Sequence, residues 1–304
     1  MTGGAGYLGS ILVPRLLQAG HAVLVMDTFR YGQTPLLDWC GHSGLEILRA
    51  DVRDKSAVKA ALRQVDAVIP LAAIVGAPAC DRDRVAAGTT NVEAIDLLLG
   101  LRSGDQSVIY PNTNSGYGTT PEGDMASEET PCRPLSLYAK LKTVAEDHVL
   151  QRSNTVSLRL ATLFGASPRM RRDLLVNDFV WRAVTDGWLM LYEGRFRRCF
   201  SHVLDAAGAF HFALEQPLTH RVYNVGLPAA NMSKRELCEA IQRVVQTFHW
   251  IESDHARDPD QRDYLVDCSR LLAEGWRPER TLDDGIGELL QAYRILPRGP
   301  YANV

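Results

Sequence analysis

The sequence lacks the features that mark membrane-spanning, disulfide-rich and metal-stabilised proteins. No apolar run in its 304 residues approaches the roughly 20 residues that cross a bilayer, and we identify no signal peptide before the glycines at the start. The six cysteines are scattered and form no C-x-x-C pair, so we interpret them as reduced thiols and expect no metal site. We therefore expect a cytoplasmic protein that does not bind a membrane.

The sequence also lacks internal repeats, low-complexity segments and an excess of either charge. Its 33 basic and 36 acidic residues leave a net charge of −3, which gives no basic field for nucleic acid. Hydrophobic residues make up 46% of the chain, enough for a large core in one large or two smaller domains. We therefore expect a globular protein without a nucleic-acid partner.

The chain does have a glycine triplet at its start, Gly3-x-x-Gly6-x-x-Gly9, followed by an apolar helical run over 10–19. The first glycine permits a tight turn, the second lets the backbone approach a pyrophosphate, and the third allows close helix packing. The N-terminus of the helix then favours the anion. This pattern predicts a dinucleotide-binding loop, and we count Tyr7 and Leu8 among its cofactor contacts.

A strand predicted over 21–26 ends at Asp27, about 20 residues beyond the glycines. A carboxylate there accepts hydrogen bonds from the ribose hydroxyls and repels a 2′-phosphate, so Asp27 favours NAD over NADP. The nearby Arg30 weakens that preference. Only Met1 and Thr2 stand before the glycines, and the sequence leaves open whether they are a shortened first strand.

Strands and helices continue to alternate through the first half of the chain. We expect strands over 45–50, 67–71, 107–110 and 155–160, and helices over 56–64 and 84–101. This order predicts a Rossmann-type doubly wound parallel sheet of the α/β class, in which ligands bind at the carboxyl ends of the strands. Those ends carry Asp51, Ala72, Thr113 and Leu163.

The pattern changes after residue 165. Shorter strands over 222–225 and 264–266 and helices over 234–248 and 282–293 predict a smaller C-terminal α/β lobe. We expect residues 1–165 to be the NAD-binding Rossmann domain and residues 166–304 to be mainly a substrate-binding lobe. Some segments of the second part are expected to return to the Rossmann sheet.

A predicted helix near the middle of the chain carries Tyr138 and Lys142, four residues apart and therefore on one face. The ordinary pKa of a phenol is about 10. A cation about 4 Å away, at an effective dielectric constant of about 20, favours the phenolate by roughly 4 kcal/mol, which lowers that pKa by about 3 before any desolvation cost. The pair is thus a candidate general base near neutral pH. Such pairs also occur by chance on surface helices, so the motif depends on its context.

Six motifs occur in order along the chain and together resemble those of one family. They are Thr2-Gly3-x-x-Gly6-x-x-Gly9, Asp27, Asp51-Val52, Leu71-Ala72-Ala73, Thr113-Asn114-Ser115-Gly116-Tyr117-Gly118 and Tyr138-x-x-x-Lys142. The chain resembles the extended short-chain dehydrogenase/reductases, specifically the NAD-dependent nucleotide-sugar epimerase/dehydratase family typified by UDP-galactose 4-epimerase. The resemblance covers nearly the whole chain.

The resemblance implies roles for individual residues. Tyr138 is the expected catalytic base, Lys142 its cationic partner on the nicotinamide ribose, and Thr113 the group that hydrogen-bonds the reacting sugar hydroxyl. The resemblance also implies that NAD is the cofactor, with contacts from Asp51, Val52, Leu71, Ala72, Ala73, Asn91 and Leu163. The expected contacts to a nucleotide-sugar substrate are Thr113, Asn114, Ser115, Asn177, Arg198, Arg257 and Arg262. The arginines suit a pyrophosphate, although any one of them is equally explained as a solvated surface residue.

We interpret this constellation as NAD-dependent oxidation at C4 of a nucleotide-activated sugar, with 4-epimerisation as the expected reaction. Related 4,6-dehydratases have Asp-Glu after the threonine, whereas Asn114-Ser115 stands here, and neither residue acts readily as an acid or base. The main alternative is a nucleotide-sugar 4-dehydrogenase or 4-ketoreductase. A 4,6-dehydratase is a weaker alternative, and a non-catalytic NAD sensor is a third.

The oligomeric state is suggested by two helices. The helices over 84–101 and 137–151 resemble the pair that forms a four-helix dimer interface in this family. Packing on the sheet explains their apolar faces equally well. We expect a homodimer.

Overall fold

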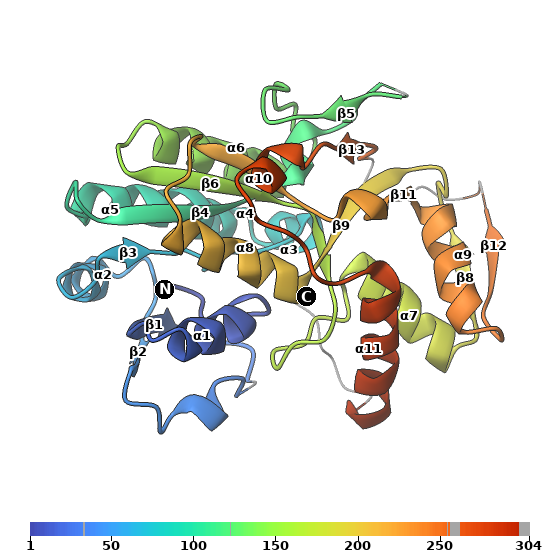
Figure 1. The fold of residues 1–304 in the computed structure, drawn as a ribbon, viewed down its shortest axis with the longest axis horizontal. Helices are drawn as coiled ribbons and strands as arrows, with labels where there is room; N and C mark the ends of the chain where they lie inside the picture. The colour runs from blue at the N-terminus through green and yellow to red at the C-terminus, as the bar shows by residue number, and fades with distance from the viewer. Residues whose placement is uncertain (33, 122, 254, 256–261, 298–304) are drawn as a thin grey trace.

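A twisted parallel sheet forms the larger part of the molecule (Figure 1). The computed structural model describes residues 1–32, 34–121, 123–253, 255 and 262–297. All pairings within the sheet are parallel: β1 pairs with β2, and the other strands follow the order β10-β6-β4-β3. The strands are β1 (Val23–Asp27), β2 (Leu45–Arg49), β3 (Ala67–Val68), β4 (Ser107–Thr113), β6 (Thr155–Leu160) and β10 (Val222–Val225). The predicted fold class is confirmed.

The two groups of strands meet at Thr2. This residue forms parallel bridges with Met26 in β1 and with Pro70 just after β3. Its backbone therefore occupies the place of a first strand between the two groups, with the glycine loop starting at its carboxyl end. Through these two bridges Thr2 links the two groups of strands.

Helices cover both faces of the sheet. On one face α1 (Gly9–Gln18) packs against α8 (Val203–Glu215), and on the other face lie α2 (Lys55–Leu62), α5 (Ala94–Leu101) and α6 (Leu137–Leu150). Each buries an apolar stripe on the strands, as the sequence period predicts. Strand β10 and helix α8 come from the second half of the chain, which agrees with the prediction that some later segments return to the sheet.

The helix expected over 84–101 is interrupted. It consists of α4 (Arg84–Gly88), a π-helical turn η2 (Thr89–Glu93) and α5. The buried Asn91 lies in that turn, where its amide accepts a hydrogen bond from the backbone N–H of Ile74 at 2.8 Å and donates to the Ile74 carbonyl at 2.9 Å. The widened turn thus fastens the segment after β3, a local arrangement that the apolar period does not reveal.

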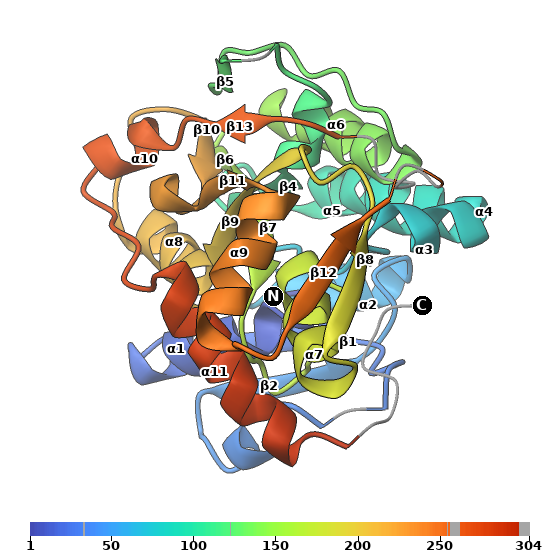
Figure 2. The same ribbon diagram turned by 90° about the vertical axis from the view of Figure 1, so that its right-hand side faces the viewer.

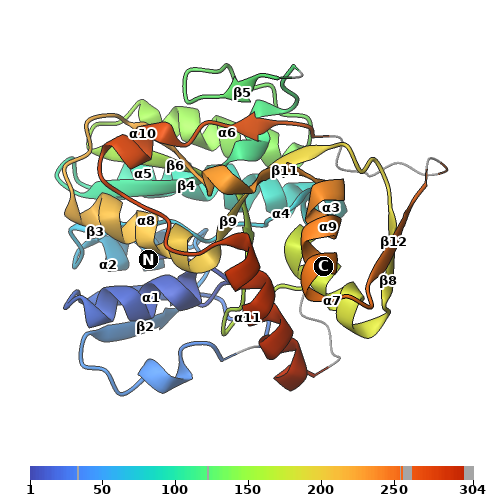
Figure 3. The same cartoon turned by 45° about the vertical axis from the view of Figure 1, so that its right-hand side comes forward.

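The remaining elements form the second lobe and the connections (Figures 2 and 3). Strands β7 and β9 pair in parallel and β9 pairs antiparallel with β11, while β8 pairs with β12 and β5 with β13. The strands are β5 (Met125–Ala126), β7 (Thr162–Phe164), β8 (Trp188–Leu191), β9 (Arg197–His202), β11 (Asn231–Ser233), β12 (His249–Glu252) and β13 (Leu265–Val266). The helices are η1 (Leu37–Trp39), α3 (Ala77–Arg82), η3 (Asn114–Tyr117), α7 (Leu175–Thr185), η4 (Pro228–Ala230), α9 (Lys234–Val244), α10 (Ser269–Ala273) and α11 (Leu282–Ile295).

The hydrophobic core runs across both parts of the molecule. Its largest cluster joins buried residues of α1, α8 and the sheet with those of α7, α9 and α11, and a second cluster lies under α2, α5 and α6. The lobe is therefore packed on the sheet through shared apolar side chains. Among the described helices we find none with the length and apolar character needed to cross a membrane.

Candidate active site

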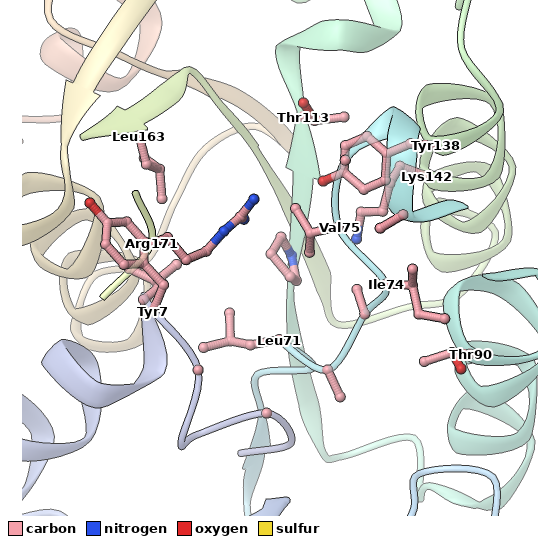
Figure 4. A pocket seen from close by; sticks show the side chains of 18 of the residues that line it. Tyr7, Leu71, Ile74, Val75, Thr90, Thr113, Tyr138, Lys142, Leu163 and Arg171 are labelled. Atoms are coloured by element: carbon pink, nitrogen blue, oxygen red, sulfur yellow. The ribbon is translucent and has the colours of Figure 1, made fainter. Parts of the chain in front are cut away.

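A cavity of about 1230 Å³ opens at the carboxyl ends of the central strands, between the sheet and the second lobe. Figure 4 shows side chains from both sides of this cavity. Most of the residues predicted as cofactor contacts line it: Gly3, Gly6, Tyr7, Leu8, Gly9, Asp27, Asp51, Val52, Leu71, Ala72, Ala73, Tyr138, Lys142 and Leu163. Residues widely separated in the sequence are thus gathered on one surface.

The glycine loop leaves no room for side chains where it meets the strand ends. Gly3 has a φ of +69°, and a Cβ built on it would lie 2.5 Å from the backbone nitrogen of Ala72. A Cβ on Gly9 would lie 2.6 Å from the carbonyl oxygen of Gly3. These contacts are what close approach between loop, helix and strand requires, so the loop fits a bound pyrophosphate.

Asp27 stands at the end of β1 with its carboxylate held in place. One oxygen accepts a hydrogen bond from the backbone N–H of Ala5 at 3.0 Å, and the other accepts from Phe29 N–H at 2.8 Å. The carboxylate is therefore oriented at the cavity edge, beside the glycine loop, where a ribose diol needs an acceptor. This geometry fits the adenosine half of NAD.

Asp51 lies on the same wall and has a partner that the sequence analysis did not name. Arg53 forms a bidentate ion pair with it, with an Nη2–Oδ2 distance of 2.6 Å. The hydrogen bond from this guanidinium lowers the pKa of Asp51. Arg53 itself lines the cavity, as does Arg30, so the predicted adenine end has two flanking cations.

Tyr138 and Lys142 project from the first two turns of α6 into the cavity (Figure 4). The helix is started by Ser136, whose hydroxyl accepts a hydrogen bond from Ala139 N–H at 3.2 Å. The ammonium of Lys142 lies 4.1 Å from the centre of the Tyr110 ring on β4, an arrangement that favours a cation. Thr113, at the end of β4, lies above Tyr138 in the same view. The three predicted catalytic residues are therefore brought together.

The electrostatics of this pair differ from the sequence prediction. Burial raises the pKa of Tyr138 to about 12, and among the charges acting on it the cation that lowers it most is Arg171 rather than Lys142. Burial lowers the pKa of Lys142 to about 7, partly offset by Glu146. Desolvation therefore outweighs the attraction between the two side chains, because both ends of the pair are removed from water.

The Thr113 turn differs from an acid–base site. The Thr113 hydroxyl donates a hydrogen bond to Ser115 Oγ at 2.9 Å and accepts one from Ser115 N–H at 3.2 Å. Ser115 lines the cavity, whereas Asn114 is fully buried and does not. The side chain at Asn114 is thus placed away from the predicted substrate position.

Two asparagines predicted to contact ligands, Asn91 and Asn177, bond to backbone groups and do not line the cavity. Asn91 bonds to Ile74, as described above. The fully buried Asn177 accepts a hydrogen bond from Gly165 N–H at 3.0 Å and donates to the Arg171 carbonyl at 2.8 Å. Both residues therefore position loops at the cavity wall, since their amides are already occupied by backbone groups.

Of the predicted phosphate-binding arginines, Arg198 and Arg262 line the cavity. The Arg198 guanidinium donates a hydrogen bond to the backbone oxygen of Arg262, so the two residues are neighbours on the cavity wall. Arg257 lies outside the described residues. The second lobe thus supplies two cations to the cavity wall.

Arg171 is a functional candidate to which the sequence analysis gave no role. Its guanidinium points across the cavity toward Tyr138 (Figure 4) and pairs with Asp173 at 2.5 Å. Arg169, two residues earlier, also lines the cavity and lies 4.0 Å from the centre of the Tyr31 ring. The sequence does hold a clue to both residues, because Arg169-Met170-Arg171-Arg172 follows soon after the end of β7.

Comparison with known proteins supports this arrangement. Residues 1–226 match the model of the NAD-dependent epimerase/dehydratase family. The UDP-glucose 4-epimerase of Thermus thermophilus, whose structure was solved in complex with NAD, has a TM-score of 0.84 and 27% identity, covering 97% of this chain and 98% of its own.

Two curated relatives show how wide the chemistry of similar chains is. The UDP-glucuronic acid decarboxylase 1 of Xenopus tropicalis is 28% identical over 310 residues, which are 97% of this chain and 71% of that protein. A dTDP-glucose 4,6-dehydratase of an Actinoplanes species is 27% identical over 318 residues, 97% of each chain. An epimerase, a decarboxylase and a dehydratase are thus about equally similar, so similarity alone does not select one reaction.

Proposed function

The chain belongs to the NAD-dependent epimerase/dehydratase family, and from this we propose that it is a 4-epimerase of a nucleotide-activated sugar. Enzymes of this family act on nucleotide sugars with NAD as cofactor, and the residues lining the cavity fit that cofactor. The observation that carries the proposal is the convergence of Thr113, Tyr138 and Lys142 on the cavity that also contains the glycine loop.

In this proposal Tyr138 and Thr113 have different roles at one sugar hydroxyl, the one on C4. Bound NAD⁺ supplies a hydride acceptor and a positive charge. Tyr138 accepts the proton of the C4 hydroxyl, and Thr113 holds the same hydroxyl by a hydrogen bond. Lys142 holds the nicotinamide ribose and, when charged, favours the phenolate. The predicted pyrophosphate contacts, Arg198 and Arg262, hold the nucleotide end so that the sugar ring is free to turn.

The turn after Thr113 supports epimerisation over dehydration. Elimination of water needs an acid and a base beside the oxidised carbon. Here the two following positions hold a buried asparagine, Asn114, and a serine, Ser115, that is engaged with the Thr113 hydroxyl. A 4-keto sugar bound here therefore meets no matched carboxyl pair from this turn, which favours return of the hydride.

The proposal is tested by the product and by one substitution. We expect the purified protein to release NAD on denaturation and to convert one of a panel of nucleotide sugars, including UDP-glucose and UDP-glucuronic acid, to its C4 epimer. Both are measured by mass spectrometry and proton NMR. Tyr138→Phe keeps the ring but removes the proton acceptor, so we expect at least a hundredfold loss of turnover, as for other general bases, with NAD still bound.

The control is Tyr192→Phe, which makes the same change on a tyrosine that does not line the cavity. It should leave turnover unchanged. Survival of full turnover in Tyr138→Phe would show that another group accepts the proton. A product lacking water or carbon dioxide would replace epimerisation by dehydration or decarboxylation.

A second candidate concerns the sugar itself and rests on Arg171. This guanidinium reaches into the cavity opposite Tyr138, where the sugar ring is expected. Its Nε and Nη2 already donate to Asp173, so what it offers a carboxylate-bearing sugar is its charge and a hydrogen bond from Nη1. The candidate is therefore a nucleotide uronate, and the panel above decides it by comparing the two UDP sugars.

We also propose a homodimer formed through the outer faces of α4, η2, α5 and α6. These helices carry solvent-exposed apolar side chains, including Val85 and Val144, at 77% and 43% exposure. The His148–Asp96 pair, at 2.7 Å, lies between α6 and α5 on the same outer side. Val85 on α4 and Val144 on α6 lie on helices that contact each other, as a four-helix interface requires.

A further inference from the structure

A buried ion pair lies beneath the helix that carries Tyr138 and Lys142. Glu146 follows Lys142 by four residues on the same face of α6, and only 1% of it is exposed. Its carboxylate accepts hydrogen bonds from Arg159 Nη2 at 2.7 Å, from Arg159 Nε at 3.1 Å and from Ser157 Oγ at 2.5 Å. Arg159 and Ser157 belong to β6, so a two-pronged contact joins the catalytic helix to the centre of the sheet.

The same arginine also reaches the turn that carries Thr113. Arg159 Nη1 donates to the hydroxyl of Tyr117 at 3.0 Å. Tyr117 ends the short helix η3, which begins directly after Thr113, and its own hydroxyl donates to Asn224 Oδ1 on β10 at 2.7 Å. One guanidinium therefore connects the two elements whose separation sets the distance between Thr113 and Tyr138.

We propose that Glu146 and Arg159 are positioning residues that hold α6 and the Thr113 turn in register for the chemistry at Tyr138. The inference rests on the proposed function of Tyr138. Stability alone is a poor explanation for such a pair, because desolvation of two buried charges consumes most of their attraction and apolar pairs replace them without loss. Orientation explains the pair better, because the planar guanidinium of Arg159 fixes the direction and distance of its hydrogen bonds to Glu146 on α6 and to Tyr117 on η3.

Glu146 has a second effect, which acts through Lys142. Its negative charge partly offsets the burial that lowers the pKa of Lys142 to about 7. Several titratable groups lie on Lys142's own helix and on the described elements packed against it. They are Tyr138, Lys140, Glu146, Asp147 and His148 on α6, Cys80, Asp81 and Arg82 on α3, Arg84 on α4, Glu93 on η2, Asp96 on α5, Tyr110 on β4, Tyr117 on η3 and Arg159 on β6. Among these described groups, Glu146 is the one whose charge shifts the titration of Lys142. Glu146 therefore helps to keep Lys142 charged at neutral pH.

The chain allows this effect to be measured directly. It contains five lysines, at positions 55, 59, 140, 142 and 234, so a sample labelled with ¹³C at lysine Cε gives five side-chain signals. The Lys142 signal is the one missing from Lys142→Met. In Glu146→Gln we expect its titration midpoint to fall by about 1 pH unit, as for loss of a nearby opposite charge. Asp147→Asn removes a carboxylate from the adjacent, solvent-exposed position and should leave the midpoint unchanged.

Catalysis provides the second readout. Glu146→Gln should lower kcat while KM changes little, because the groups that bind the nucleotide lie elsewhere on the cavity wall. As the pH is raised, Lys142 loses its charge, so the rate of Glu146→Gln should decline at a lower pH than the rate of Asp147→Asn. If the unpaired Arg159 prevents folding of Glu146→Gln, the double variant Glu146→Gln/Arg159→Met carries the same measurements without a buried unpaired cation.

Wild-type kcat in a folded Glu146→Gln or double variant would overturn the positioning role, and an unchanged Lys142 midpoint would overturn the effect of Glu146 on Lys142. The NMR titration needs no substrate, so its outcome is separate from that of the proposed function. A wild-type protein that turns over no nucleotide sugar would remove the epimerase proposal, and the Lys142 midpoint would still decide whether Glu146 acts on Lys142.

Discussion

At the scale of single residues, the buried amine of Lys142 makes a prediction about stability. Burial lowers its pKa from the ordinary 10.5 to about 7. Between those values the unfolded chain binds one more proton than the folded chain, so the free energy of unfolding rises with pH over that window. Lys142→Met removes this contribution. The stability of the wild type relative to Lys142→Met should therefore increase by about 3 kcal/mol between pH 6 and pH 9.

Urea unfolding of both proteins at the two pH values measures the difference, and every other titrating group is common to the pair. Equal pH dependence of the two proteins would mean that Lys142 keeps its ordinary pKa in the folded state.

The catalytic residues also show what the sequence reveals at this scale. Spacing places Tyr138 and Lys142 on one helix face, and both line the cavity with Thr113. Spacing carries no information about desolvation, and burial raises the pKa of Tyr138 where the spacing alone predicts a lower one. Arg171 received no role because its position depends on a loop path that no period describes. Roles for Asn91 and Asn177 came from resemblance, which does not reveal that their amides are already bonded to backbone.

At the scale of elements, the glycine loop makes the sharpest prediction. Gly3→Ala forces a Cβ to within 2.5 Å of the Ala72 nitrogen and places alanine at a φ of +69°, which alone costs about 1–2 kcal/mol. The loop must then move away from β3 and from the cofactor. We expect at least tenfold weaker NAD binding by isothermal titration calorimetry, which corresponds to about 1.4 kcal/mol.

Gly104→Ala is the matched control, because a Cβ there has no neighbour within 4 Å and the backbone is not left-handed. It should bind NAD as the wild type does. Wild-type affinity in Gly3→Ala would show that the loop adapts and that its close approach is not needed.

The elements themselves were predictable where periodicity is strong. The strand over 155–160 is found with the predicted bounds, and the helix starting at 137 is found as predicted. Periodicity failed where tertiary contacts set the backbone. The π-helical turn at 89–93 contains Asn91, whose amide bonds to Ile74. Strand β3 ends at Val68, before the predicted residue 71, and Pro70, which has no N–H to donate, forms only a bridge to Thr2. Both irregularities lie beside residues that line the cavity, Thr90 and Leu71, where the backbone must shape the proposed binding site as well as pair within the sheet.

At the scale of the whole molecule, the order of strands and helices predicted the fold class. The shared core explains why the division near residue 165 is less sharp than the change of pattern there suggests. Helix α8 and strand β10 follow that position in the sequence, yet they complete the sheet of the first half. The cavity therefore lies between two parts that are packed together through α1, α7, α8, α9 and α11. The residues on its predicted cofactor side could be named from the sequence, because they follow the carboxyl ends of strands that the sequence pattern predicts. The substrate side depends on loops of the second lobe, whose paths that pattern does not predict.

The proposed homodimer is tested by adding a charge to its apolar patch. Val144 is 43% exposed on α6, and Val184 is 46% exposed on α7, outside the patch. Val144→Glu would bury a carboxylate against the partner's copy of the same helices, and an unpaired buried charge costs far more than the loss of one apolar contact. We expect Val144→Glu to sediment as a folded monomer at micromolar concentration while Val184→Glu sediments as the wild-type dimer. Because the cavity is built within one chain and α6 carries Tyr138, the monomer should keep bound NAD but lose some turnover as α6 loosens. A dimer that persists in Val144→Glu would place the interface on another face, and a monomeric wild type would remove it.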